Sequence, residues 1–351
     1  MTEVVAQTKA NPMVTPNRVG LTKKDYFGSA STLCTGCGHD SVTLHLISAF
    51  YELELEPHQV AKFSGIGCSS KTPAYFLSGA HGFNAVHGRM PSVATGAAMS
   101  HRRMVNIAVS GDGDTASIGM GQFVHILRRN IPLLYIIENN GVYGLTKGQF
   151  SATSDKGSLQ KKGEVNTLES IDLCLLALEL GCGYVGRSFS GDAKQMVPLI
   201  KGGISHGGTA VLDVISPCIT FNNHEGSTKS YKFVKEHDQA IHEIGFVPSY
   251  TPIDVEYDHG STKVIDLPNG SHLTLKKIDR DYDPTNRQAA FEVLHRARAE
   301  GTLLTGLFYI NPDTVPYQEV MRLSETPLVQ LSLNELRPSQ SSLKEVMESL
   351  K

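Results

Sequence analysis

The feature that most limits what this chain can fold into is a glycine-rich acidic turn between two apolar runs. Residues 105–110 (VNIAVS) predict a buried strand, and the turn GDGD, which contains Asp112, follows it directly. A helical pattern comes next, and residues 133–137 (LLYII) then predict a second strand that ends at Asn139 and Asn140. Because neighbouring parallel strands end at the same edge of a sheet, the acid and the amides are expected to lie side by side.

This unit is part of a longer alternation of strands and helices. The alternation runs from residue 34 to about 216 and predicts an α/β fold, a parallel sheet flanked by helices. Residues 209–215 are expected to form the last core strand, with one amphipathic helix near 285–299 beyond it. Hydrophobic residues make up 40% of the chain, enough for a sizeable core. We therefore expect an N-terminal arm (1–25), a core domain (26–225) and a C-terminal extension (226–351).

Charge and hydropathy exclude two classes of partner. The net charge is −3, and the chain has no Trp and no long basic run, which argues against a dedicated nucleic-acid binder. The longest apolar run, residues 131–137, is far shorter than the ~18 residues that a membrane span needs. The first residues lack the basic and apolar regions of a signal peptide. A cytoplasmic location is therefore expected.

The six cysteines indicate metal or redox chemistry rather than a disulfide framework. Cys34 and Cys37 form a C-x-x-C pair within LCTGCGH, and the other four are scattered singly. Gly38 stands where haem attachment would need His, and there is no second close pair for a zinc site. A site with four ligands must therefore gather them from distant loops. Cys174 and Cys182 fall on an apolar helical stripe, so we expect these two to be buried.

The acid and amides at the two strand ends have a specific chemical meaning. A carboxylate, a side-chain amide oxygen and a backbone carbonyl are hard donors that suit Mg²⁺ bound to ligand phosphates. The glycines allow the backbone to approach a diphosphate at a helix N-terminus. GDG alone is usually an ordinary tight turn, but together with the Asn pair it predicts a Mg²⁺–diphosphate site. Neither G-x-G-x-x-G after this strand nor a P-loop motif is present, so Rossmann and P-loop interpretations are disfavoured.

GDG followed by NN resembles the motif that binds thiamine diphosphate. The wider string GDGDTASIGMGQFVHILRRNIPLLYIIENNGVYGLTKGQFSAT is similar to the β subunits of 2-oxoacid:ferredoxin oxidoreductases. LCTGCGH, GIGCSSK and HGR match the same family. The resemblance covers roughly residues 25–235, and the longer C-terminal part looks more like the 2-oxoglutarate type.

The resemblance implies thiamine diphosphate, Mg²⁺ and one 4Fe–4S cluster as cofactors. Mg²⁺ would be bound by the side chains of Asp112 and Asn140 and by the carbonyl of Val142. The other positions implied for thiamine diphosphate are Ile66, Gly67, Cys68, Ser69, Gly113, Asp114, Gly144 and Leu145. The cluster would be held by Cys34, Cys37, Cys68 and Cys218. The sequence agrees with this set, because thiolates suit iron–sulfur clusters and these four lie in turns.

Two lysines stand beside the expected cofactor within these motifs. Lys71 follows Cys68 closely, and Lys147 follows Leu145. We expect the lysines to provide compact positive charge for substrate carboxylates or CoA phosphates, and Leu145 and Lys147 to shape the site for the acid's tail. The histidines and arginine of the same motifs either position substrate or cofactor or make structural hydrogen bonds. They are His39, His87 and Arg89.

The implied activity is the thiamine-dependent oxidative decarboxylation of a 2-oxoacid with CoA. With 2-oxoglutarate as substrate, the products are succinyl-CoA, CO₂ and reduced ferredoxin. Three alternatives are a pyruvate-type enzyme, a subunit of a non-redox thiamine-dependent decarboxylase or carboligase, and a non-catalytic iron–sulfur subunit. The four turn cysteines argue against the non-redox enzyme, and GDG…NN argues against the non-catalytic subunit.

A partner chain is expected for a chemical reason. Thiamine enzymes need a carboxylate against the aminopyrimidine ring, and in this family of folds a second, pyrimidine-binding domain supplies it. A chain of 351 residues with one GDG…NN unit leaves little room for that domain. We therefore expect an α subunit to supply it and, as in the family, two αβ units to pair into a heterotetramer.

Overall fold

An eight-stranded sheet forms the centre of the protein. The computed structural model describes residues 11–159, 163–247, 262–266, 272–277 and 282–351. The strands of the sheet are β1 (Val60–Ser64), β2 (His81–Asn84), β3 (Val105–Gly111), β4 (Leu133–Asn139), β7 (Tyr184–Phe189), β8 (Thr209–Ile215), β9 (Asp238–Ala240) and β13 (Leu303–Ile310). Their order is β2-β1-β3-β4-β8-β7-β13-β9. The strands from β2 to β7 are parallel, and β13 runs antiparallel to β7. The expected α/β fold with a mostly parallel sheet is confirmed.

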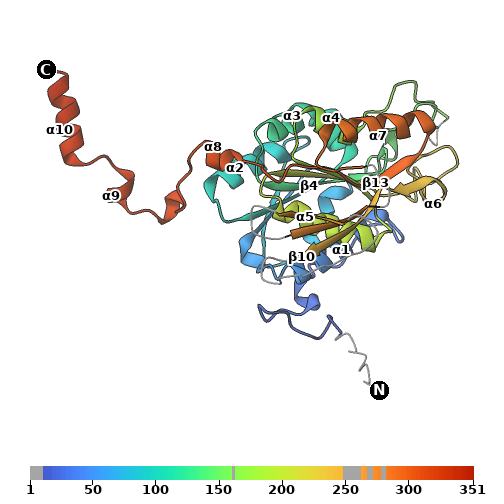
Figure 1. Cartoon of the computed structure of the whole chain (residues 1–351), viewed down its shortest axis with the longest axis horizontal. Coiled ribbons are helices and arrows are strands. Elements are labelled where there is room, and N and C mark those ends of the chain that lie inside the picture. The colour runs from blue at the N-terminus through green and yellow to red at the C-terminus, as the bar shows by residue number, and fades with distance from the viewer. Residues whose placement is uncertain (1–10, 160–162, 248–261, 267–271, 278–281) are drawn as a thin grey trace.

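Helices cover both faces of the sheet, with α1 and α5 on one face and α2, α3, α4 and α7 on the other (Figure 1). Their bounds are α1 (Gly38–Glu52), α2 (Met90–Ser100), α3 (Met120–Arg128), α4 (Leu173–Glu179), α5 (Ala193–Ser205) and α7 (Arg287–Glu300). Tyr135 and Ile137 of β4 pack toward α3 and α4, whereas Leu134 and Ile136 pack toward α1 and α5. Both faces of this strand are therefore apolar, as in parallel sheets that are covered on both sides.

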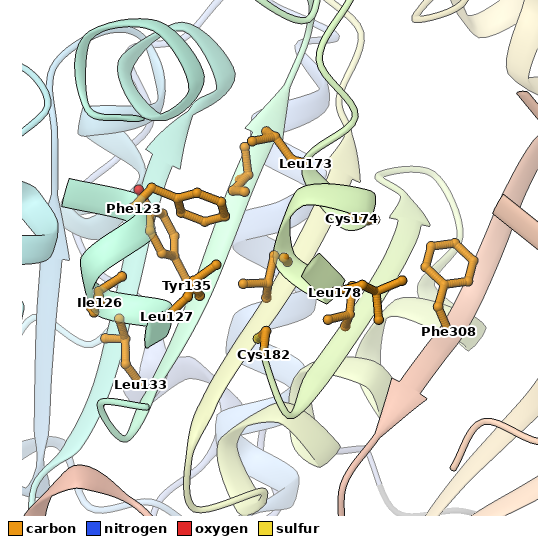
Figure 2. Close-up of a cluster of buried hydrophobic side chains, with 14 of the residues drawn as sticks. Phe123, Ile126, Leu127, Leu133, Tyr135, Leu173, Cys174, Leu178, Cys182 and Phe308 are labelled. Carbon is orange, nitrogen blue, oxygen red and sulfur yellow. The ribbon is translucent and has the colours of Figure 1, made fainter. Parts of the chain in front are cut away.

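The cluster under α3 and α4 contains the two cysteines that are not in turns (Figure 2). Phe123 packs edge-on against Tyr135, with ring centroids 5.4 Å apart. Cys174 and Cys182 are 0% and 1% exposed, so the expectation that they are buried is confirmed. Burial also raises the pKa of the Cys182 thiol to about 12, which makes it an inert apolar side chain at neutral pH.

The expectation that Thr209–Ile215 is the last core strand is wrong. β13 lies much later in the chain, and its Leu307 and Phe308 are fully buried in the main sheet. Gly306 and Thr305 interrupt its apolar pattern, which hides the strand in the sequence. Because β9 pairs with β13, two strands of the expected C-terminal extension complete the same sheet as the core.

The described part of the expected N-terminal arm packs on its own chain. Asn17 donates from Nδ2 to the hydroxyl of Tyr26 (2.9 Å) and to the carbonyl of Tyr51 in α1 (3.0 Å). Tyr26 is fully buried at the end of a short 3₁₀ helix, η1 (Lys23–Tyr26). The first ten residues lie outside the described part of the chain.

Smaller elements surround the sheet, and the C-terminal tail leads away from it (Figure 1). The tail exposes apolar side chains of α10 such as Leu343 and Val346. None of the described helices has the length and hydropathy that crossing a membrane requires. The remaining elements are η2 (Pro57–Gln59), η3 (Ser69–Ala74), the π-helical turn η4 (Asp114–Ile118), β5 (Val142–Tyr143), β6 (Gln149–Phe150), α6 (Tyr231–His237), β10 (His242–Val247), β11 (Thr262–Asp266), β12 (His272–Lys277), α8 (Tyr317–Val320), η5 (Leu328–Gln330), α9 (Leu333–Leu336) and α10 (Gln340–Ser349).

Candidate functional site

The ends of β3 and β4 bring the acidic turn and the Asn pair together, as their order in the sheet requires. Asp112 directly follows β3 and is 1% exposed, and Asn140 directly follows β4 and is 5% exposed. The backbone N–H of Asn140 donates to Oδ1 of Asp112 at 3.2 Å. The amide oxygen of Asn140 accepts the N–H of Val142 at 3.0 Å, which fixes the turn that carries the Val142 carbonyl. Three oxygen donors therefore stand on one short stretch of the sheet edge.

A second segment, residues 151–153, donates hydrogen bonds to the buried Asp112 carboxylate. The hydroxyls of Ser151 and Thr153 both donate to its Oδ2, the latter at 2.6 Å. Burial raises the pKa of the Asp112 carboxyl, and the hydrogen bonds from these hydroxyls oppose that rise. Ser151 and Thr153 were absent from the residues expected from sequence. Their only signal is that they close the motif string, at SAT.

A cavity of about 470 Å³ opens beside this carboxylate. Every residue expected to bind thiamine diphosphate or Mg²⁺ lines it, namely residues 66–69, 112–114, 140, 142 and 144–145. The structure therefore brings together three segments that are far apart in the sequence.

The cavity wall contains a polar group suited to an anionic ligand. The hydroxyl of Ser69 is buried and finds no hydrogen-bond partner among the described residues. It lies at the start of η3, and a Cβ added to Gly111 would stand 3.0 Å from it. An unpaired buried hydroxyl is costly, and a phosphate oxygen in the cavity would satisfy it. The donor set and this hydroxyl fit a metal-bound diphosphate.

Contacts within the fold also explain why positions 113 and 114 are occupied by Gly and Asp. A Cβ on Gly113 would lie 2.4 Å from the ring of Tyr143, whose hydroxyl donates to the Gly113 carbonyl at 3.0 Å. Asp114 accepts the N–H of Gly88 at 2.9 Å and the hydroxyl of Ser110 at 3.0 Å. Asp114 thus ties the HGR segment to the turn.

The four turn cysteines approach one another at the side of the cavity. A Cβ on Gly144 would lie 3.5 Å from Sγ of Cys68 and 3.8 Å from Sγ of Cys218. Cys37 is the N-cap of α1, and the next residue donates its N–H to the carbonyl of Pro217 at 3.3 Å. Burial raises the pKa of the Cys37 thiol to about 12, and burial and the nearby Cys218 raise that of Cys68.

The spacing of these thiols bears on which metal group they fit. Within the described residues, no three His, Cys, Asp or Glu side chains are arranged to hold a single metal ion. Thiolates that hold a four-iron cluster bind different irons, so they stand farther apart than the ligands of one ion. Of the four turn thiols, those of Cys68 and Cys218 are the two that lie beside Gly144.

The two lysines lie outside the cavity wall, since neither is among the described residues that line it. Lys71 is half-buried, and its charge lowers the pKa of the Cys68 thiol against the larger effect of burial. Lys147 is exposed and has φ 80°, in the left-handed region that a residue with a Cβ rarely adopts. Such strain in a turn beside a cavity is a feature of functional sites.

Glu138 is a further carboxyl of the cavity wall, and sequence reasoning missed it. It is fully buried and accepts from the hydroxyl of Thr72 at 3.0 Å. Nδ1 of His39 lies 3.7 Å away, and the same nitrogen is 2.6 Å from the hydroxyl of Ser216. Burial raises the pKa of Glu138 well above its usual value and lowers that of His39 to about 4. His39 is therefore neutral at pH 7, and burial disfavours the charged form of Glu138. The available signal for Glu138 was a charged residue at the end of an apolar strand.

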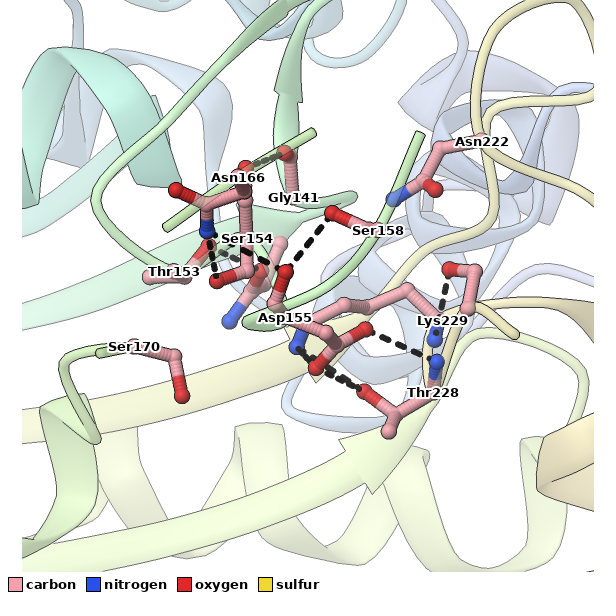
Figure 3. Close-up of polar contacts among 12 residues, drawn as sticks. Gly141, Thr153, Ser154, Asp155, Ser158, Asn166, Ser170, Asn222, Thr228 and Lys229 are labelled. Carbon is pink, nitrogen blue, oxygen red and sulfur yellow. Dashed lines mark hydrogen bonds and ion pairs between the residues drawn. The ribbon is translucent and has the colours of Figure 1, made fainter. Parts of the chain in front are cut away.

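A larger cavity of about 780 Å³ lies between the sheet end and α7. Most of its charged side chains pair with one another: Lys229 with Asp155 (Figure 3), and Arg187 with Asp172 and Asp213. Arg298 also lines this cavity and donates to the carbonyl of Ser170 at 3.1 Å. The smaller cavity, with its unpaired hydroxyl and oxygen donors, is the better candidate for the functional site.

The fold and this strand-end site define a thiamine-diphosphate-binding domain. Residues 65–214 match the family described as thiamine pyrophosphate enzyme, C-terminal TPP binding domain. Residues 273–325 match the C-terminal region of the pyruvate ferredoxin oxidoreductase beta subunit.

Three known proteins make the assignment more specific. The beta subunit of a 2-oxoacid:ferredoxin oxidoreductase from Sulfolobus sp. is 37% identical over 63% of this chain and 70% of its own length. Subunit beta of 2-oxoacid:ferredoxin oxidoreductase 1 from Aeropyrum pernix is 33% identical over 82% and 80%. A solved 2-oxoglutarate:ferredoxin oxidoreductase from Magnetococcus marinus, with 2-oxoglutarate, coenzyme A and succinyl-CoA bound, has a TM-score of 0.71 and 28% identity over 91% and 97%. This chain belongs to the β subunits of the 2-oxoacid:ferredoxin oxidoreductases.

Proposed function

We propose that this chain is the subunit that binds the diphosphate end of thiamine diphosphate, in an enzyme that decarboxylates 2-oxoglutarate oxidatively. The reaction would use CoA and give succinyl-CoA, CO₂ and reduced ferredoxin. The observation that carries the proposal is the joint placement of Asp112, Asn140 and the unpaired Ser69 hydroxyl in one cavity. The name of the similar Magnetococcus protein, which was solved with 2-oxoglutarate and succinyl-CoA, supports this choice of substrate.

The chain's own residues would bind and orient the cofactor. The side chains of Asp112 and Asn140 and the carbonyl of Val142 would hold Mg²⁺, because a hard cation prefers such oxygen donors. Ser69 and the backbone of the GDG turn would donate to the diphosphate. When bound, thiamine diphosphate supplies the electron sink for decarboxylation, and an iron–sulfur cluster supplies one-electron transfer.

Cys68 links the two proposed cofactor sites. It lines the cavity, and its sulfur and that of Cys218 lie 3.5 and 3.8 Å from the position of a Gly144 Cβ. We propose that these two residues, with Cys34 and Cys37, hold a 4Fe–4S cluster. Such a cluster would stand directly beside the cofactor cavity, as transfer of electrons from one to the other requires.

The surface around the cavity supports an α-subunit partner. Val86, Ile118 and Leu145 are 70%, 50% and 53% exposed. Val86 precedes His87, which lines the cavity with Leu145, and Ile118 contacts the neighbouring Gly88. Exposed apolar side chains that surround a site are typical of a surface that another chain covers. The proposed α subunit would cover this rim and supply the carboxylate for the aminopyrimidine, and two αβ units would pair.

The test is to assay the chain alone and after addition of its α subunit. We expect the isolated chain to carry its iron and to show no CoA-dependent oxidation of 2-oxoglutarate with a low-potential electron acceptor. Activity is expected on addition of the α subunit, because only then is the pyrimidine end of the cofactor anchored and activated. Robust oxidation by the isolated chain would contradict the proposal.

Substrate preference gives a separate prediction for Lys147. Replacing it by Gln should lower the ratio of kcat/KM for 2-oxoglutarate over pyruvate by about tenfold, because a distal carboxylate loses a cation. The matched control is Lys156→Gln, an equally exposed lysine that pairs with Glu169 away from the cavity. An unchanged ratio in the Lys147 variant would assign the preference to the α subunit.

A further inference from the structure

The hydrogen bonds of Asp112 leave only one of its oxygens for a metal. A carboxylate has about four lone-pair positions, two on each oxygen. On Oδ2 both are used, by the hydroxyls of Ser151 and Thr153. On Oδ1 one is used, by the N–H of Asn140 at 3.2 Å. Because both positions of Oδ2 are occupied, a metal can bind Asp112 through Oδ1 but not through both oxygens.

The hydroxyl proton of Thr153 has three possible acceptors. The hydroxyl is 2.6 Å from Asp112 Oδ2, 3.0 Å from Oδ1 of Asn139 and 3.1 Å from the hydroxyl of Ser151. The orientation of the Asn139 amide is set on its other side, where Nδ2 donates to Asp213, an ion-pair partner of Arg187. Because a carboxylate is a stronger hydrogen-bond acceptor than an amide and its contact with Thr153 is shorter, the Thr153 hydroxyl donates to Asp112.

The segment that carries the two hydroxyls is itself fixed (Figure 3). The hydroxyl of Ser154 donates to the carbonyl of Gly141, next to the Asn pair. Asn166 donates from Nδ2 to the carbonyl of Ser154 at 3.0 Å, and Asp155 pairs with Lys229 at 3.0 Å. The hydroxyls are therefore held against Asp112 before any metal binds, which is the requirement for a preorganised metal site.

We propose that Ser151 and Thr153 are positioning residues that make the site selective for Mg²⁺ over Ca²⁺, by keeping Asp112 a one-oxygen ligand. Mg²⁺ demands near-ideal octahedral geometry with few protein ligands, whereas Ca²⁺ takes more oxygens and readily accepts a carboxylate through both. Occupation of Oδ2 by the two hydroxyls therefore lowers the affinity of the site for Ca²⁺ more than its affinity for Mg²⁺. This inference rests on the proposed function, since it concerns the metal that would hold the diphosphate.

The experiment measures thiamine diphosphate retained by the reconstituted αβ complex during equilibrium dialysis against graded Mg²⁺ or Ca²⁺. In Thr153→Val, the Mg²⁺ affinity should fall by about 100-fold, as for the loss of other groups that orient a metal ligand. The Ca²⁺ affinity should fall by less than about tenfold, so that the Mg²⁺/Ca²⁺ ratio decreases at least about tenfold. Thr153→Ser keeps the donor and should restore the ratio to within about threefold of the unmodified protein.

Two further variants separate positioning from stability. Thr209→Val removes a hydroxyl that is equally buried and donates to the carbonyl of Ile131 at 2.6 Å, far from the cavity, and should leave the ratio unchanged. Ser151→Ala removes the other donor to Oδ2, so it tests the inference if Thr153→Val does not fold.

An unchanged ratio in Thr153→Val and Ser151→Ala would overturn this inference. If Asp112→Asn still abolished retention, the proposed function would stand without it. Retention by Asp112→Asn as well would overturn both.

Discussion

Asp112→Asn is expected to lower the affinity of the reconstituted αβ complex for thiamine diphosphate by about 100-fold or more at fixed Mg²⁺. Asp112 is the only anion among the three proposed metal ligands. The substitution keeps the size of the side chain but removes its charge. The new amide can lie in two orientations, because either its N–H₂ or its oxygen faces the hydroxyl donors of Ser151 and Thr153. In both orientations the group that faces the metal is a weaker metal ligand than a carboxylate oxygen. Isothermal titration with thiamine diphosphate measures the effect.

The folded state should survive this substitution, because a buried carboxylate is costly and its loss removes a desolvation penalty. A melting temperature close to that of the unmodified protein would therefore accompany the loss of cofactor. The matched control is Asp313→Asn, which removes an exposed carboxylate and should change neither quantity. Full cofactor occupancy in the Asp112 variant would mean that the strand-end turn is not the metal site.

Cys218→Ser should reduce the iron and sulfide content of the purified chain by at least about tenfold and abolish ferredoxin reduction in the complex. A serine oxygen is a poor ligand for the soft irons of a cluster. No other thiol is placed to replace it among the described residues, because Cys174 and Cys182 are buried in the core cluster under α4. Iron and sulfide analysis and visible absorbance of anaerobically purified protein measure the change.

Cys174→Ser is the control for the cluster. Its thiol is fully buried and donates weakly to the carbonyl of Gly186, a contact that a hydroxyl can keep. Iron content should remain normal even if the melting temperature falls by a few degrees. Equal loss of iron in the two variants would mean that Cys218 is not a ligand and that iron is lost through instability.

Several parts of the site were readable from the sequence because their signals are local. The GDGD turn and the Asn pair each follow an apolar strand, and the order of parallel strands brings the two ends together. Glu138 and Thr153 carried no such signal. Each is a common residue next to a motif, and its role depends on which side chains the fold places opposite it.

The C-terminal part illustrates the same limit at the level of the fold. The run LLTGLFYI is apolar, but Gly306 breaks its pattern, and its partner strand β7 lies more than a hundred residues earlier in the sequence. The sequence of a strand does not reveal a partner at such a distance, because strand formation depends on the neighbouring strand as much as on the strand's own residues.

The sequence by itself determined the class of fold and the family, and it predicted the segments that line the cavity. Hydrophobic period, strand-end turns and thiol-bearing loops are properties of short segments, and short segments suffice to identify them. Only the tertiary structure decided which oxygen of Asp112 can still bind a metal. It also decided that Ser69 has no hydrogen-bond partner among the described residues, and that Lys71 and Lys147 stand outside the cavity wall. These facts depend on contacts between segments far apart in the chain, where burial and hydrogen bonding, rather than residue type, set what each group can do.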